Sequence, residues 1–522
     1  MNEQAPTTSP AATEPASPVR ATRATRATRS AKRTVQRGLS RRTVVLAAGA
    51  AAGGLAISRV LGLHQLGLDP LALGQSAVPT PTVNTKDWVS PLDQPEAQVA
   101  QLLRRATFGM TRVQYDAALK DGFKTTVDRL IETPAVAPKD LVGADMASQD
   151  KPINVAALQT WWLDHMLVTP TPFAERMTFF WHGHFTSDFR KVTTQSPYIY
   201  WQNQTWRKFG LGSLRDMLYK VTTDPGMLRY LDLGQSTGKA PNENYSREVM
   251  ELFTMGVGTF SEDDVRGGAK ALAGWREPIT QPMVDAIIAR AKKDGRPAPK
   301  RLVADTVTTG VYDPARAYRG PVTFLGETKQ WDTNSVLDKI MAQPSVAPYL
   351  AGKVIREFVT PDPSDAYVGR IADSWKKSKY DTKTLMRDIF MSPEFLQPAA
   401  YRSLVKSPTE VMVHLARALE QPSLARTIAL SGSGMGQALF DPPEVGGWPN
   451  NASWVSTNNV LTRVNFVVTT LGAMQRVPAF GNAHQIHLDG IVSPQTAQLL
   501  NSANDDQTRW LILLAAPEFQ LK

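Results

Sequence analysis

From residue 96 onward, helix-length stretches with apolar residues at 3.6-residue spacing alternate with short segments rich in Gly and Pro. This spacing is typical of amphipathic helices, and only two stretches have the β-branched character of strands. We therefore expect a mainly α protein with one large helical domain over residues 96–522. An irregular insertion containing a few short strands is expected at about residues 276–331. Helices are predicted at residues 111–119, 173–181, 213–222, 242–255, 263–272, 335–341, 347–358, 366–376, 382–391, 408–419, 457–471 and 507–515, and strand-like stretches at 301–311 and 322–325.

The first 95 residues differ in composition from this body. Residues 1–39 are rich in Pro, Ala, Thr and Arg, and such a segment buries too little apolar surface to fold, so we expect a disordered basic region. Arg41 and Arg42 follow, directly before a short, weakly apolar stretch rich in Ala and Gly. Paired arginines in this position favour a twin-arginine export signal over residues 40–74. Residues 75–95, with four prolines, are predicted to be a linker.

Such a signal has consequences for location and partners. The resemblance to twin-arginine signals implies export of an already folded protein, often loaded with a cofactor, by the twin-arginine translocase. We therefore expect the protein in the periplasm, in the cell envelope or outside the cell. The signal has no clear cleavage site, so a retained N-terminal anchor stays open. No apolar run reaches the roughly 18–20 residues of a membrane span, so no other membrane domain is expected.

The charge distribution and the lack of cysteine exclude several classes of function. The net charge is +10, but residues 1–42 hold nine basic and two acidic residues, which leaves 49 basic and 46 acidic residues in the rest. Nucleic-acid binding requires clustered positive charge on the folded domain and is therefore not expected. Without cysteine, disulfides, thiolate zinc sites, iron–sulfur clusters and c-type haem are excluded. No phosphate-binding or dinucleotide motif is present.

His182 and His184 form a His-x-His pair. In an extended segment, both imidazoles would point to one face, which is a common arrangement of metal ligands. In a helix they would lie about 200° apart and could not share a metal. Because Gly183 suggests that a helix ends here, the geometry stays open. The alternative is two histidines that form hydrogen bonds within an aromatic cluster.

A second candidate lies on the predicted helix that ends before Gly256. At helical spacing Asn244, Glu248 and Glu251 fall within a sector of roughly 60° beside the apolar stripe. Carboxylates in this position need a partner, which we expect to be a metal, a substrate, or an arginine such as Arg176 or Arg247. The alternative is a half-exposed acidic stripe with a weak Arg–Glu pair.

A third candidate is the segment 435–449, which is dense in Gly and Pro and is predicted to be a structured loop. Its Asp441 and Trp448 are candidate substrate-binding residues, because aromatic faces beside carboxylates suit sugar rings. Equally, the aromatic residues could only pin the loop to the core.

These segments together resemble a bacterial family known as domain of unknown function 1800 (DUF1800). The matching stretches are Leu102 to Gly109, Phe180 to Phe185, Asn242 to Glu248, Gly320 to Gly326, Phe440 to Pro449 and Pro517 to Leu521. The resemblance implies a mostly helical, exported protein with no established reaction, and a second, sulfatase-like exported protein as a partner. In such proteins Asn often lies between the two histidines and a further His occurs before the helix-ending glycine. Here Gly183 and Phe253 occupy these positions.

Two interpretations follow. In the first, the protein is an exported metal-dependent hydrolase or oxidoreductase, with His182, His184, Glu248 and Glu251 as ligands of zinc, iron or manganese. Glycans and esters are the expected substrates. In the second, the protein is a non-enzymatic exported binding or assembly protein, in which these residues form a buried polar network.

Overall fold

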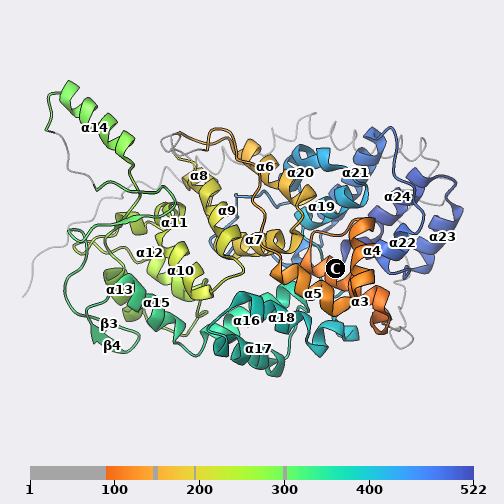
Figure 1. Cartoon of the computed structure of the whole chain (residues 1–522), viewed down its shortest axis with the longest axis horizontal. Coiled ribbons are helices and arrows are strands. Elements are labelled where there is room, and N and C mark those ends of the chain that lie inside the picture. Colours follow the sequence, from red (N-terminus) through yellow and green to blue (C-terminus); the bar gives the residue numbers. More distant parts are fainter. Residues whose placement is uncertain (1–89, 145–150, 193–195, 298–301) are drawn as a thin grey trace, which may run out of the picture. The chain divides into compact units, whose positions relative to one another are not determined.

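The computed structural model describes residues 90–144, 151–192, 196–297 and 302–522 (Figure 1). In these ranges helices dominate and the strands form two short antiparallel pairs, which confirms the expected mainly α fold. Residues Trp88–Lys522 belong to one compact unit. The predicted basic region, the export signal with Arg41 and Arg42, and most of the linker lie outside the described residues.

The helices are α3 (Pro95–Ala106), α4 (Arg112–Asp121), α5 (Phe123–Glu132), α6 (Val155–Val168), α7 (Pro172–His184), α8 (Phe189–Val192), α9 (Tyr198–Phe209), α10 (Leu214–Thr223), α11 (Pro225–Tyr230), α12 (Asn244–Glu251), α13 (Glu262–Ala271), α14 (Gln281–Lys293), α15 (Thr333–Met341), α16 (Val346–Phe358), α17 (Asp365–Lys377), α18 (Thr382–Phe390), α19 (Pro408–Ala418), α20 (Ala425–Gly434), α21 (Thr457–Ala473), α22 (Ala483–Leu488), α23 (Pro494–Ser502) and α24 (Asp506–Ala515). All twelve predicted helices correspond to one of these. Some boundaries differ from the predicted ones because a capping residue sets them: Asp332 caps α15, which begins at Thr333, two residues before its predicted start. The predicted helix 242–255 is shorter as α12, because Asn242 Oδ1 accepts a hydrogen bond from the Asn244 N–H and forms a turn before it.

The insertion contains the strands. β1 (Trp275–Arg276) pairs with β2 (Val311–Tyr312), and β3 (Val322–Phe324) pairs with β4 (Glu327–Lys329). The strand predicted at 322–325 is therefore confirmed. The strand predicted at 301–311 is wrong, because its described part is irregular up to Val311, the first residue with a backbone partner in β1. The insertion also contains α14, which the sequence analysis did not predict and whose side chains, except for Val284, are at least partly exposed.

Two clusters of buried side chains form the core, and α7 packs against both. The larger cluster is built mainly from α5, α7, α10, α12 and α15 to α18. The second combines α6, α9, α19, α20, α21 and α24. Phe173, Met177 and Trp181 of α7 belong to the larger cluster, whereas Phe179 packs against the second. Residues spaced i, i+4 and i+8 face one side of a helix, so α7 presents one apolar face to each cluster.

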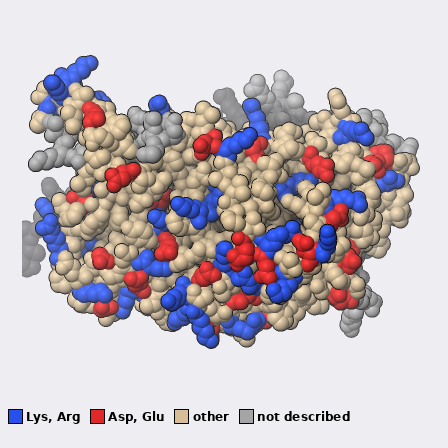
Figure 2. Space-filling model, in the orientation of Figure 1, with Lys and Arg blue, Asp and Glu red and all other residues tan. Residues whose placement is uncertain are grey.

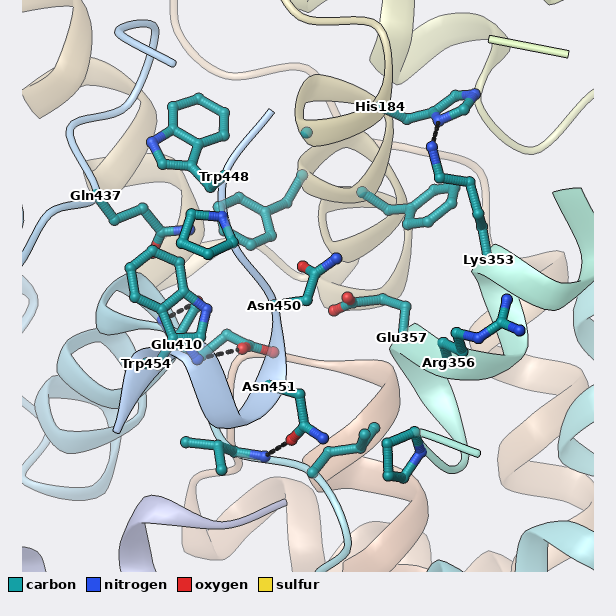
Figure 3. A pocket seen from close by; sticks show the side chains of 18 of the residues that line it. His184, Lys353, Arg356, Glu357, Glu410, Gln437, Trp448, Asn450, Asn451 and Trp454 are labelled. Atoms are coloured by element: carbon teal, nitrogen blue, oxygen red, sulfur yellow. Dashed lines mark hydrogen bonds between the residues drawn. The ribbon is translucent and has the colours of Figure 1, made fainter. Parts of the chain in front are cut away.

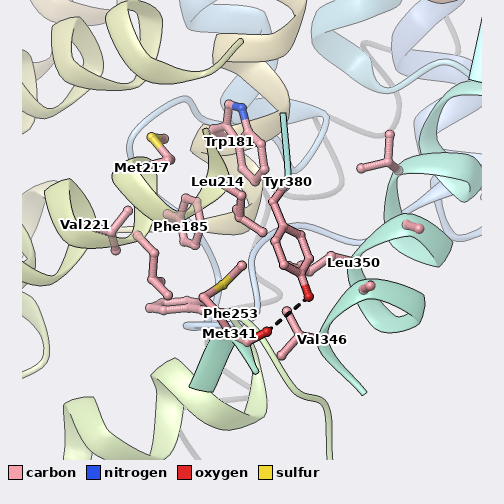
Figure 4. Close-up of a cluster of buried hydrophobic side chains, with 14 of the residues drawn as sticks. Trp181, Phe185, Leu214, Met217, Val221, Phe253, Met341, Val346, Leu350 and Tyr380 are labelled. Atoms are coloured by element: carbon pink, nitrogen blue, oxygen red, sulfur yellow. Dashed lines mark hydrogen bonds between the residues drawn. The ribbon is translucent and has the colours of Figure 1, made fainter. Parts of the chain in front are cut away.

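Figure 4 shows part of the larger cluster around the C-terminal end of α7. Trp181 and Phe185 stack with their ring centroids 5.2 Å apart, and both are buried. Leu214 of α10 packs beside them, and Tyr380 donates a hydrogen bond of 3.1 Å to the Met341 carbonyl. These contacts hold the end of α7 against the larger cluster.

The surface carries charged side chains of both signs. On the face shown in Figure 2, basic and acidic side chains are interspersed. Among the described residues, no helix combines the length and the apolar character that a membrane crossing requires.

Candidate functional site

A cavity of about 500 Å³ lies beside α7 (Figure 3). Its walls come from α7, from α16, from residues 404–410 at the start of α19, from the loop 437–454 and from Lys522. Because these segments are far apart in the chain, only the folded domain creates the cavity.

The loop 437–454 is pinned against the end of α7. The Thr186 hydroxyl donates a hydrogen bond of 2.6 Å to the Val445 carbonyl. Gly447 has φ +94°, and a Cβ there would lie 2.3 Å from the Gly183 carbonyl oxygen. Only glycine combines this φ with this close approach, so the loop reaches α7 at a position where no side chain fits.

Four charged side chains form a network at one side of the cavity. The fully buried Arg176 bonds through Nη2 to Glu357 and, at 2.8 Å, to Glu410. Lys522 Nζ bonds to Glu410 and lies 3.1 Å from Glu357. Burial opposes ionisation of Glu410, but Lys522 and Arg176 outweigh it and hold its pKa at about 2. The pKa of Glu357 is lowered by the same two cations, against its burial.

Local structure orients Glu410. It is the third residue of α19, where its Oε2 accepts a hydrogen bond of 2.7 Å from the Ser407 N–H. The Ser407 hydroxyl caps the helix in return, which completes a capping box. This arrangement fixes the carboxylate rotamer, so Oε1 is directed to the two cations.

His184 lies at the end of α7 and contacts Lys353 of α16. Its Nε2 is 3.1 Å from the Phe253 carbonyl, so this nitrogen carries the proton, and its Nδ1 accepts a hydrogen bond of 3.2 Å from Lys353 Nζ. Burial and the neighbouring Lys353 charge lower the pKa of His184 well below its usual value. Burial also lowers the pKa of Lys353, to about 8. Lys353 Nζ is 3.4 Å from the Leu252 carbonyl.

His182 projects to a different side of α7. Its Nε2 accepts a hydrogen bond of 3.1 Å from the Phe440 N–H, and its ring packs between Trp162 and Trp448. Burial lowers the pKa of His182 to about 3, so the ring is neutral at physiological pH. His182 thus anchors the loop 437–454 to α7.

Aromatic and amide side chains of this loop form the wall opposite α16 (Figure 3). They are Trp448, Asn450, Asn451 and Trp454. Asn451 Oδ1 accepts a hydrogen bond of 2.7 Å from the Val405 N–H. Within the described part of the chain, the Asn450 amide and the two indole N–H groups have no hydrogen-bond partner. This wall therefore presents apolar ring surface together with unused polar groups.

The four predicted metal ligands are not brought together. Because α7 continues through His184, His182 and His184 point to different neighbours, and Glu248 and Glu251 lie on α12 and do not line the cavity. Burial and the neighbouring Glu251 raise the pKa of Glu248. In the ranges that the structure describes, no group of three or more His, Asp and Glu side chains could hold a metal ion.

The other predicted site residues are divided between the cavity and the surface. Arg176 and Trp448 line the cavity. Arg247 forms two hydrogen bonds with Glu262, of 2.6 and 2.7 Å, and Asn244 begins α12.

Asp441 likewise lies away from the cavity lining. It forms an ion pair with Arg190. Its carboxylate therefore has a charged partner on the surface and is not one of the groups that face the cavity.

Five charged residues of the cavity were not predicted from the sequence: Lys353, Arg356, Glu357, Glu410 and Lys522. Glu410 had a detectable signal, because Ser and Glu three residues apart at a helix start indicate a capping box. Lys353 and Glu357 share a helix face through their i, i+4 spacing. Nothing in the pattern indicates that Lys522 reaches either glutamate.

The comparison with protein families found a match over most of the chain. The family described as "Protein of unknown function (DUF1800)" matches residues 101–521. The chain belongs to the DUF1800 family. This match spans every cavity residue of the DUF1800 domain except Lys522. Neither the search of curated proteins nor the search of solved structures found a match.

Proposed function

We propose that this DUF1800 protein is exported and binds a saccharide in the cavity beside α7. The observation that carries the proposal is the wall formed by Trp448, Asn450 and Trp454. Aromatic rings offer apolar faces to the C–H surface of a sugar ring, and the unused amide and indole groups suit its hydroxyls. The cavity volume of about 500 Å³ is in the range of small-ligand sites.

The charged side of the cavity favours binding over hydrolysis by its two carboxylates. Glycoside hydrolysis needs one carboxyl group that keeps a proton near neutral pH. Lys522 and Arg176 overcome the effect of burial and lower the pKa of both Glu357 and Glu410, so neither is a proton donor there. The metal-dependent reaction and the sulfatase-like partner stay predictions from the sequence.

Binding is tested by calorimetric titration of the purified chain with a panel of neutral and acidic oligosaccharides. We expect at least one to bind, and Trp448→Ala to weaken that binding tenfold or more. A matched control is Trp275→Phe, which changes a tryptophan remote from the cavity lining. Absence of binding by any oligosaccharide, or an unchanged affinity in Trp448→Ala, would contradict the proposal.

Export is tested separately, by cell fractionation of the host. The Arg41–Arg42 pair supports it. Replacing both with Lys keeps the charge but removes the pair that the twin-arginine translocase recognises. We expect the variant to remain in the cytoplasm, while a chain with Arg29→Lys is exported as the wild type is. Export of the double variant would refute the assignment of the signal.

A further inference from the structure

The cavity holds more positive than negative charge. Its charged lining consists of Arg176, Lys353, Arg356 and Lys522 against Glu357 and Glu410. Both histidines are neutral, because their pKa values are lowered by burial. Arg176 and Lys522 share both carboxylates. Two cations, Lys353 and Arg356, are therefore left without a carboxylate.

Lys353 has only neutral neighbours as acceptors. Its Nζ contacts His184 Nδ1 at 3.2 Å and the Leu252 carbonyl at 3.4 Å, and it lies 5.2 Å from the centre of the Tyr349 ring. A largely buried ammonium group with no counter-ion is unfavourable, and an anion in the cavity would relieve that cost.

Arg356 lies one turn further along α16. Both Lys353 and Arg356 line the cavity and come from its α16 side, across from Trp448 and Trp454 (Figure 3). Among the described residues, Arg356 makes no hydrogen bond or ion pair, and its side chain is exposed. A guanidinium free in this way can bind an oxyanion through two parallel hydrogen bonds.

The fully buried Arg176 also has unused hydrogen-bonding capacity at this cavity. Its Nε and Nη1 have no partner within the described ranges, although Nη2 serves both glutamates. The centre of the Phe358 ring is 5.0 Å from its guanidinium carbon. The charge of Arg176 is balanced by the two glutamates, so the surplus positive charge of the cavity stays with Lys353 and Arg356.

We propose that Lys353 and Arg356 form an anion subsite of the cavity, so that its ligand is an acidic saccharide. This proposal rests on the proposed function, in which the wall of Trp448 and Trp454 holds the sugar ring. Across the cavity from this wall, the subsite would hold an oxyanion of the same ligand, either a ring carboxylate or a sulfate ester. The aromatic wall then supplies affinity for the ring, and the subsite supplies the preference for charge.

The test compares three probes that differ in charge: trigalacturonate, its fully methyl-esterified and neutral form, and a galactose trisaccharide carrying sulfate esters. Calorimetric titrations use the full chain at low salt, because surface-accessible charges are screened by salt. We expect at least one anionic probe to bind tenfold or more tightly than the neutral ester. The favoured anion identifies the oxyanion as carboxylate or sulfate.

Two variants then separate this subsite from the general charge of the protein. We expect Lys353→Met and Arg356→Gln each to reduce the ratio of acid to ester affinity to near one. Arg266→Gln, an exposed substitution on α13, is the matched control and should keep the wild-type ratio. Circular dichroism and the melting temperature check that each variant is folded, and Arg356→Gln keeps the test decisive if Lys353→Met unfolds.

The possible results are distinguishable. If none of the three probes and no other oligosaccharide binds, both the proposed function and the subsite are wrong. If the neutral ester binds as tightly as the acids, or the two variants keep the wild-type ratio, the saccharide site stands and the anion subsite is refuted.

Discussion

We expect the network of Arg176, Glu357, Glu410 and Lys522 to make a large contribution to the free energy of unfolding. Replacing Arg176 by Met keeps an elongated apolar side chain but leaves two buried carboxylates with one ammonium group. Removing one partner from a buried ion pair costs about 3–5 kcal/mol. Because domains are stable by only about 5–15 kcal/mol, we expect Arg176→Met to lose about a fifth or more of the free energy of unfolding.

A second substitution separates the free energy lost with the ion pairs of Arg176 from the free energy lost with its packing. Glu410→Gln removes one negative charge, and Gln can still accept the capping bond from the Ser407 N–H. In the double variant, Lys522 and Glu357 remain as a neutral pair. We therefore expect the double variant to be at least about 2 kcal/mol more stable than the sum of the two single losses predicts.

The assay is urea unfolding at pH 7, followed by tryptophan fluorescence. The control is the exposed pair of Arg247 and Glu262, whose side chains are 35% and 63% accessible. Arg247→Met should change the free energy of unfolding by less than about 1 kcal/mol, as exposed ion pairs do. A loss from Arg176→Met no greater than that of this control would refute the expected cost of breaking the network, as would additive losses from Arg176→Met and Glu410→Gln.

Two further substitutions test the fold around the site. Gly447→Ala places a Cβ 2.3 Å from the Gly183 carbonyl at a positive φ, so we expect a loss of about 1–3 kcal/mol in thermal unfolding and weaker oligosaccharide binding; wild-type values for both would contradict the close approach. Asp224, the N-cap of α11, has its pKa raised to about 7 by burial, so the folded state retains a proton that the unfolded state releases near pH 4. Stability from this group is present below about pH 4 and falls by roughly 4 kcal/mol as pH rises to about 7. Asp224→Asn keeps the cap, so its free energy of unfolding should depend less on pH over this interval, and an unchanged slope would refute the assignment.

Much of the fold could be predicted because periodicity and caps are local. A capping residue lies next to the helix whose end it sets. Thr111 and Ser407 cap the starts of their helices, and Gly122 follows the end of α4. The insertion was harder, since β1 and β2 are two residues each and depend on pairing between distant segments. The Thr- and Val-rich stretch 301–311 has strand propensity but no partner strand before Val311, so context overrides propensity.

The site was only partly predictable, because it too depends on contacts between distant segments. The histidine pair pointed to the correct helix, but the sequence could not decide whether Gly183 ends it; Gly183 lies inside α7, and this separates His182 from His184. Lys522 was not predictable, because its partners are placed by tertiary packing.

The contacts of Lys522 with Glu357 and Glu410 also bear on the order in which the domain folds. Lys522 reaches Glu357 across 165 residues, and Arg176 reaches Glu410 across 234. Until Lys522 has docked, Glu357 and Glu410 share a single cation, Arg176. Contacts of such long sequence separation form late and slowly. We therefore expect the charged network beside the cavity to be among the last parts of the domain to form during refolding.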